Sequence, residues 1–216
     1  MKGFFMLISS YNQKALGDIL IVYVAPDVDE QAVETHQSIT RIYDPAKNET
    51  LGYNIANVSQ ILGQLNVNGQ VFLTDAQVDQ LNEALAAADF VPDLKADHEP
   101  KFVVGYVKTA EQHPDSNHLL VTQTEVQDGQ VVQIVSGSPN MQADIKVVVA
   151  EVGAMMPDGL IIWPGKLRGV ESDGMISSGR ELRIPNAPDR PGALILPDDY
   201  EVGQPFDFEK AQTLFQ

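Results

Sequence analysis

The sequence contains no cysteine, which excludes disulfide bonds, thiol catalysis and cysteine-ligated zinc sites. Cations are scarce as well, since 14 Lys and Arg residues stand against 30 Asp and Glu residues, giving a formal net charge of −16. No apolar run reaches the roughly 18 residues of a membrane-spanning helix. The short apolar run Phe4–Ile8 has neither the length nor the cleavage site of a signal peptide. We therefore expect a cytoplasmic protein without membrane attachment.

The chain is 216 residues long and 44% hydrophobic, enough for one large or two modest domains. Residues 91–100 are polar, flanked by prolines and without periodicity, which is typical of a linker. The sequence thus predicts two domains at residues 1–90 and 101–208, with a linker at 91–100 and a tail at 209–216.

Residues 1–90 combine strand and helix signals. The expected strands are Phe4–Ile8, Ile19–Val24, Ile39–Tyr43, Thr50–Ile55 and Gln70–Leu73. A helix should follow Thr74, because Thr74 and Gln77 have the spacing of a capping box. Its apolar face would consist of Val78, Leu81 and Leu85. This predicts an α+β domain, for which the residues indicate no role.

Residues 101–208 show a different pattern of short, β-branched segments separated by turns. The expected strands are Phe102–Val107, Leu119–Glu125, Val131–Val135 and Lys146–Ala150. Asp128-Gly129 is a hairpin signal between the second and third of them. The pattern predicts an all-β domain, a small antiparallel barrel. A helix or turn around Asn140–Asp144 would suit an OB-fold, whose sheet face and loops bind oligonucleotides.

One stretch departs from the acidic background. Residues 166–183 carry four cations against three anions, a net charge of +1. Lys166 and Arg168 alternate on what should be an extended segment, so we expect both to point to one face and to contact phosphates or bases. Gly169 would then form the turn that follows.

Catalytic patterns are missing. His113 and His118 are five residues apart, which does not suit a helical zinc pair, and the chain has no HExxH, G-x-S-x-G or Walker A sequence. The serines have no histidine in the same motif to activate them. We expect no catalytic residue, no metal site and no cofactor.

Three blocks in order carry a resemblance to a known family. They are His113-Pro114-Asp115, Ser136-Gly137-Ser138-Pro139-Asn140 and Lys166 to Ser178. Together they resemble the tRNA-binding domain of the bacterial phenylalanyl-tRNA synthetase β chain. The two-part layout resembles the stand-alone YtpR-type tRNA-binding proteins of bacteria. The resemblance implies an OB-fold that binds structured tRNA without catalysis.

The resemblance and the chemistry of the side chains together select eight residues for RNA contacts. They are His118, Ser136, Asn140, Lys166, Arg168, Ser172, Met175 and Ser177. His118 stands where the family usually has Lys or Arg, so we expect weaker binding than in the synthetase domain.

Two other interpretations remain. The barrel could be a protein-docking or dimerisation module whose RNA affinity is lost to the acidic background. A hydrolase acting on mischarged tRNA is disfavoured by the missing triad and metal ligands. The expected partners are tRNA, an aminoacyl-tRNA synthetase or other translation factor, and a second copy of the chain in a homodimer.

Overall fold

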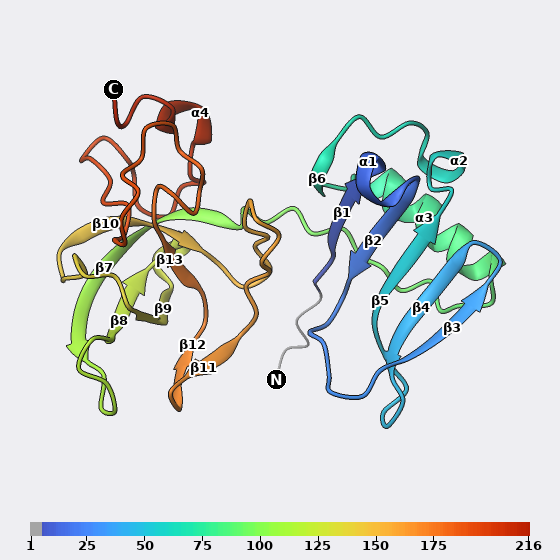
Figure 1. Cartoon of the computed structure of the whole chain (residues 1–216), viewed down its shortest axis with the longest axis horizontal. Coiled ribbons are helices and arrows are strands. Elements are labelled where there is room, and N and C mark those ends of the chain that lie inside the picture. The colour runs from blue at the N-terminus through green and yellow to red at the C-terminus, as the bar shows by residue number, and fades with distance from the viewer. Residues whose placement is uncertain (1–5) are drawn as a thin grey trace. The chain divides into compact units, whose positions relative to one another are not determined.

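The computed structural model describes residues 6–216. The chain divides between Glu99 and Pro100 into two compact units, each largely β (Figure 1). The first two residues of the expected strand Phe4–Ile8 lie outside the described residues. The strand observed here, β1, spans Ile8–Asn12 and so shares only Ile8 with the expected one.

The first unit is built on a six-stranded antiparallel sheet in the order β3-β4-β5-β2-β1-β6. The strands after β1 are β2 (Ile19–Tyr23), β3 (Ala32–His36), β4 (Ile39–Asp44), β5 (Glu49–Ala56) and β6 (Asn68–Val71). The sequence did not predict β3. It is an edge strand whose three central residues are exposed, so it lacks the apolar alternation that marks a half-buried strand.

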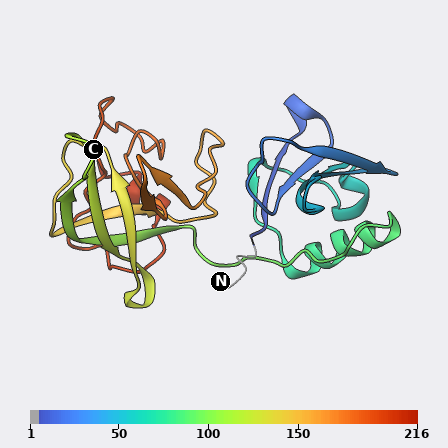
Figure 2. The same cartoon turned by 90° about the horizontal axis from the view of Figure 1, so that it is seen from below.

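Helix α3 (Asp75–Ala87) covers one face of this sheet (Figure 2). Its predicted capping box is confirmed, because Thr74 Oγ1 accepts from the Gln77 amide at 3.3 Å and Gln77 Oε1 accepts from the Thr74 amide at 3.0 Å. Two further helices, α1 (Gln13–Leu16) and α2 (Ser59–Leu62), are single turns. The unit is therefore largely β with one long helix, and not clearly the α+β domain that we expected.

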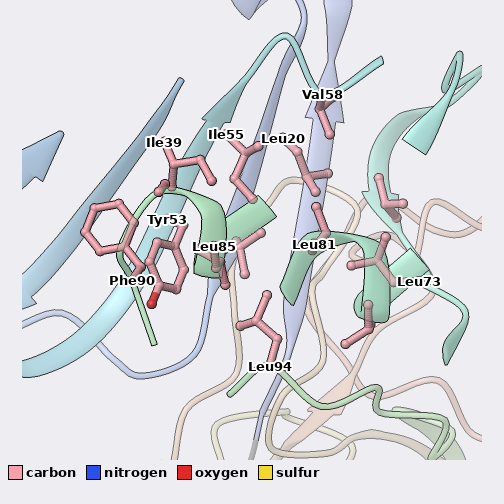
Figure 3. Close-up of a cluster of buried hydrophobic side chains, with 14 of the residues drawn as sticks. Leu20, Ile39, Tyr53, Ile55, Val58, Leu73, Leu81, Leu85, Phe90 and Leu94 are labelled. Atoms are coloured by element: carbon pink, nitrogen blue, oxygen red, sulfur yellow. The ribbon is translucent and has the colours of Figure 1, made fainter. Parts of the chain in front are cut away.

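The core of the first unit lies between the sheet and α3 (Figure 3). Leu20 and Ile55 from the sheet meet Leu81 and Leu85 from the helix, and all four are fully buried. Leu94, from the segment expected as a linker, is buried here too. The Asn82 side chain fixes it by donating to the Leu94 carbonyl at 2.9 Å and accepting from the Leu94 amide at 3.0 Å.

The second unit contains a five-stranded antiparallel sheet in the order β13-β10-β7-β8-β9, with a separate two-stranded hairpin β11-β12. The elements are β7 (Phe102–Gln112), β8 (Leu120–Glu125), η1 (Gln127–Gly129), β9 (Val131–Ser136), β10 (Ile145–Ala150), β11 (Gly165–Leu167), β12 (Val170–Ser172), β13 (Met175–Ser177) and α4 (Phe208–Ala211). Residues 140–144 form turns, not a helix.

The sheet curls into a half-barrel, and a backbone hydrogen bond links its edge strand β9 to the segment before β13. At the junction of β12 and β13 the Asp173 amide donates to the Gln133 carbonyl of β9 at 2.9 Å. Gly174 lies in this junction with a φ of 141°, and a Cβ there would lie 3.1 Å from the Ala150 carbonyl oxygen. A side chain at this position would therefore obstruct the closure.

Alternate side chains of the central strands enter two cores. Val103 and Val147 face the inside of the curled sheet, whereas Val104 and Val148 face a second core on its outer side. The chain after β13 covers that outer side, and Ala211 in α4 is fully buried there. The residues expected as a tail at 209–216 thus pack on the second unit.

Candidate nucleic-acid interface

The hairpin β11-β12 (orange in Figure 1) presents two cations. Its two-residue turn is Arg168-Gly169, with φ angles of 48° and 85°, the sign pattern of a type I′ turn. Lys166 pairs across the strands with Glu171, with 3.5 Å between Nζ and Oε1. The expectation that Lys166 and Arg168 alternate along one strand is wrong, because Arg168 lies in the turn.

The backbone of Arg168 is in the left-handed conformation, which residues other than glycine rarely adopt. Left-handed backbone costs a residue with a Cβ about 1–2 kcal/mol. Most other non-glycine residues with positive φ in the described chain are Asn or Asp, which tolerate it. The turn therefore carries an arginine at its tip at a conformational cost, and such strain often marks a functional residue.

His113 connects this hairpin to the loop between β7 and β8, residues 113–119. Its ring is almost fully buried, Nδ1 accepts from the Asp115 amide at 3.0 Å, and Nε2 donates to the Leu167 carbonyl at 3.1 Å. Because an amide can only donate and a carbonyl can only accept, these bonds fix the Nε2–H tautomer. Arg168 adds a second link by donating from Nη1 to the Asp115 carbonyl at 3.3 Å.

Four of the eight selected residues belong to this region. His118 is exposed in the 113–119 loop, with Nδ1 3.2 Å from Ser116 Oγ. Lys166 and Arg168 lie on the hairpin. Ser172 ends it, but its hydroxyl is engaged inside the fold, where it accepts from the Val135 amide at 3.0 Å.

The other four lie away from the hairpin tip. Ser136 is buried and accepts from the Ser138 amide at 3.2 Å. Asn140 holds Ala193 by accepting from its amide at 2.8 Å and donating to its carbonyl at 3.0 Å. Met175 is half-buried against the outer core. Ser177 is fully buried and, among the described residues, its Oγ has no hydrogen-bond partner, so it cannot present a hydroxyl to RNA.

Most other cations of the second unit are engaged. Lys108 pairs with Glu125 at 2.7 Å, and the Lys146 ammonium donates to two backbone carbonyls. Lys210 pairs with Asp199 at 2.7 Å, and its hydrogen bond lowers the pKa of that carboxyl. Lys166, Arg168 and Arg180 are exposed and each has one partner, whereas Arg183 and Arg190 form no ion pair with another described residue.

Sequence reasoning missed the parts of this surface that depend on tertiary contacts. His113 was considered as part of a motif and as a zinc ligand that its spacing from His118 disfavoured, and no signal in the sequence shows that its two nitrogens join two loops 54 residues apart. Arg183 was counted only as a charge, and Arg180 as a charge and as a residue that follows the third motif block. Arg190 and Phe215 were not singled out, and only the fold brings them together.

The part of the chain that the structure describes contains no cluster of three or more His, Cys, Asp or Glu side chains placed to hold a metal ion. Nor does any helix within residues 6–216 have the length and apolar character needed to cross a membrane.

Two family profiles match the chain, one for each unit. Residues 26–97 match a family described as "Domain of unknown function (DUF4479)". Residues 102–205 match one described as "Putative tRNA binding domain".

Several curated proteins are similar to the chain. The Bacillus subtilis (strain 168) protein named "Putative tRNA-binding protein YtpR" is 42% identical over 199 residues, 92% of this chain and 98% of that protein. The phenylalanine–tRNA ligase β subunit of Acinetobacter baylyi is 45% identical over 101 residues, 47% of this chain but 12% of the subunit. The corresponding subunit of Cupriavidus pinatubonensis is 44% identical over 110 residues.

The two synthetase subunits match the C-terminal half of this chain, which is the second unit. The Bacillus protein matches 92% of this chain over 98% of its own length. The two units, in this order, are thus a feature that the chain shares with that whole protein, and the chain belongs to the YtpR family.

Proposed function

We propose that the chain binds structured tRNA without catalysis, through a second unit that is an OB-fold. The order β7-β8-β9, closed through β12-β13 onto β10 and back to β7, is the strand arrangement of such a barrel. The matching family description and the printed name of the Bacillus relative support tRNA as the ligand.

The observation that carries the proposal is the His113 junction. OB-folds present to oligonucleotides the face of their second and third strands and the loops that join strands one and two and strands four and five. Here those loops are residues 113–119 and the segment from β10 to β13, which contains the hairpin. His113 holds the two together and so fixes Arg168 and Lys166 beside the 113–119 loop.

The available charge sets the strength of binding. Few cations are unengaged, and the chain as a whole carries a net charge of −16. Strands β8 and β9 contain no aromatic residue on which a base could stack. Binding should therefore be weak, salt-sensitive and based on backbone contacts and shape.

Catalysis has little support in the described residues. The Ser116 hydroxyl lies beside the His118 imidazole. The described partners of that imidazole are Ser116 and Asn117, so no carboxylate completes a triad. The buried Ser178 hydroxyl donates to the Glu181 carboxylate, and no hydrogen bond among the described residues joins it to a histidine. These contacts favour a binding protein over a hydrolase.

The proposal also includes the cellular location and the protein partners. A cytoplasmic location follows from tRNA as ligand and agrees with the absence of cysteine. A synthetase or another translation factor is the protein partner that the similarity to the synthetase subunits suggests. We also propose that the chain can form a homodimer.

The experiment is a filter-binding titration of the whole chain with total tRNA, with Lys166→Ala as the hairpin variant and Lys14→Ala in the first unit as the charge-matched control. We expect Lys166→Ala to weaken binding and Lys14→Ala to leave it unchanged. Absence of binding even at low salt would favour a docking module instead.

A further inference from the structure

A groove borders the second unit at the end of β9. It consists of two adjoining cavities of about 260 Å³ and 510 Å³ that share Ser178, Pro191 and Gly192. One wall is the end of β9 with the turn after it, from Ser136 to Asn140, and the other is the segment 188–195. We call this the 190 groove. Its size is in the range of pockets that hold small organic groups.

The walls of the 190 groove are fixed in place. Asn140 bonds both backbone groups of Ala193, and the Leu194 amide donates to the Ser177 carbonyl at 2.9 Å. Gly192 has a φ of 150° and passes so close to Asn140 that a Cβ would lie 3.1 Å from its side-chain oxygen. The groove therefore exists before any ligand arrives, which lowers the cost of ordering on binding.

Positive charge lies along the groove. Arg180 lines the smaller cavity, and its one ion pair is with Asp189 at 3.0 Å, whose side chain is 92% exposed. Arg190 lines the larger cavity and forms no ion pair with another described residue. One acid, the exposed Glu181, also lines the smaller cavity, and its Oε2 accepts from both the amide and the hydroxyl of Ser178. The larger cavity, which Arg190 lines together with no acidic residue, is thus the cationic part of the groove.

The groove also holds an aromatic ring, that of Phe215. This half-buried side chain lines the larger cavity, beside prolines 139, 188 and 191. A flat apolar ring and an arginine that line one cavity suit an unpaired nucleotide, since its base stacks on an aromatic face and its phosphate pairs with a cation. The strands β8 and β9 offer no such ring.

The groove adjoins the proposed RNA surface. Ser136 pairs with Leu120, the first residue of β8 and thus the end of the 113–119 loop. Val135, one residue earlier, is bonded to Ser172 of the hairpin. An RNA strand that contacts the loop and hairpin would therefore reach the groove along the end of β9.

We infer that the 190 groove is a second RNA subsite, which receives one unpaired nucleotide with its base against Phe215 and its phosphate on Arg190. The inference rests on the proposed function, because it extends the same surface. It also assigns to Asn140 the task of holding the groove open rather than reading a base.

The test compares full-length variants by fluorescence anisotropy, with a labelled single-stranded oligoribonucleotide and a blunt RNA duplex as probes. Arg190→Gln and Phe215→Leu remove the cation and the ring, and Leu preserves apolar packing against the outer core. Arg183→Gln is the matched control, since Arg183 is also exposed and without a described ion pair but does not line the groove. Thermal unfolding of each variant checks the fold.

We expect each groove variant to weaken binding of the single strand about fivefold or more, with little effect on the duplex. Arg190→Gln should also reduce the salt slope by about 0.7. Equal losses for Arg183→Gln and Arg190→Gln would show a general charge effect and overturn the inference. If Lys166→Ala weakens tRNA binding while both groove variants bind like the wild type, the groove is refuted and the proposed function stands. If the wild type binds neither probe nor tRNA, both fail.

Discussion

Replacing His113 tests whether one buried side chain positions the RNA surface. His113→Asn places an amide oxygen near the position of Nδ1, so it can still accept from the Asp115 amide, but it cannot reach the Leu167 carbonyl. His113→Gln places an amide nitrogen near the position of Nε2 and should keep the bond to Leu167 while losing the one to Asp115. The two variants thus separate the hairpin contact from the loop contact.

The magnitudes follow from the contacts. Losing one hydrogen bond costs about 0.5–1.5 kcal/mol, and the cost for His113→Asn should be at the low end because Leu167 is 44% exposed and its carbonyl can turn to water. The smaller side chain adds about 1 kcal/mol of lost packing. A total of about 1.5 kcal/mol should lower the Tm of the second unit by about 5–10 °C.

The effect on binding should be distinct from the effect on stability. A hairpin that is no longer held by His113 must be ordered again when RNA binds. This ordering costs about 0.5–1.5 kcal/mol of binding free energy for each long side chain that becomes immobilised. With Lys166 and Arg168 both affected, His113→Asn should weaken tRNA binding about tenfold, whereas His113→Gln should stay within about threefold of the wild type. Filter binding and calorimetry measure the two quantities. Equal affinity for His113→Asn and the wild type would refute the role of His113 as a positioning residue.

Three further predictions concern separate parts of the chain. Arg168→Gly should raise the Tm slightly, because glycine relieves the left-handed strain, while weakening tRNA binding; a lower Tm would show that the Arg168 side chain stabilises the turn. Residues 100–216 alone should unfold cooperatively and bind tRNA more tightly than the whole chain, since residues 1–99 bring an acidic surface; non-cooperative melting would show that the units depend on each other. Hydrogen bonds from Ser59 lower the pKa of Asp18 below its ordinary value of 3.8, so this carboxylate stabilises the fold above that pH, and its contribution is lost as the pH falls through the lowered pKa. Asp18→Asn should therefore melt earlier than the wild type at pH 7, with the gap closing in acid; a gap that is constant with pH would contradict the assignment.

Local signals in the sequence were enough to predict the elements that depend on neighbouring residues. The capping box at Thr74 and the apolar face of α3 were predictable because both depend on spacing along one helix. The turn at Gly169 was also predictable, whereas Arg168 was misplaced on a strand because nothing in its neighbours shows where the hairpin reverses. Edge strand β3 escaped notice because an exposed edge needs no apolar alternation.

The candidate site was harder to predict because its side chains serve the fold in ways that only tertiary structure shows. Asn140, Ser172 and Ser136 looked like donors and acceptors for RNA, and each is engaged by backbone groups. Ser177 lies on the buried side of its strand. Chemistry along the sequence identifies which residues can hydrogen-bond, but burial and partners decide which of them remain available to a ligand.

The salt dependence of tRNA binding by the whole chain tests the central claim most directly. With about three phosphates contacted, and a slope of about −0.7 per contact as for single strands, log K should fall by about 2 for each tenfold rise in salt. Filter binding across a salt series measures this slope, with Lys166→Ala expected to make it shallower by about 0.7. Tight binding that does not change with salt, or no binding at about 20 mM salt where electrostatic attraction is strongest, would contradict the account.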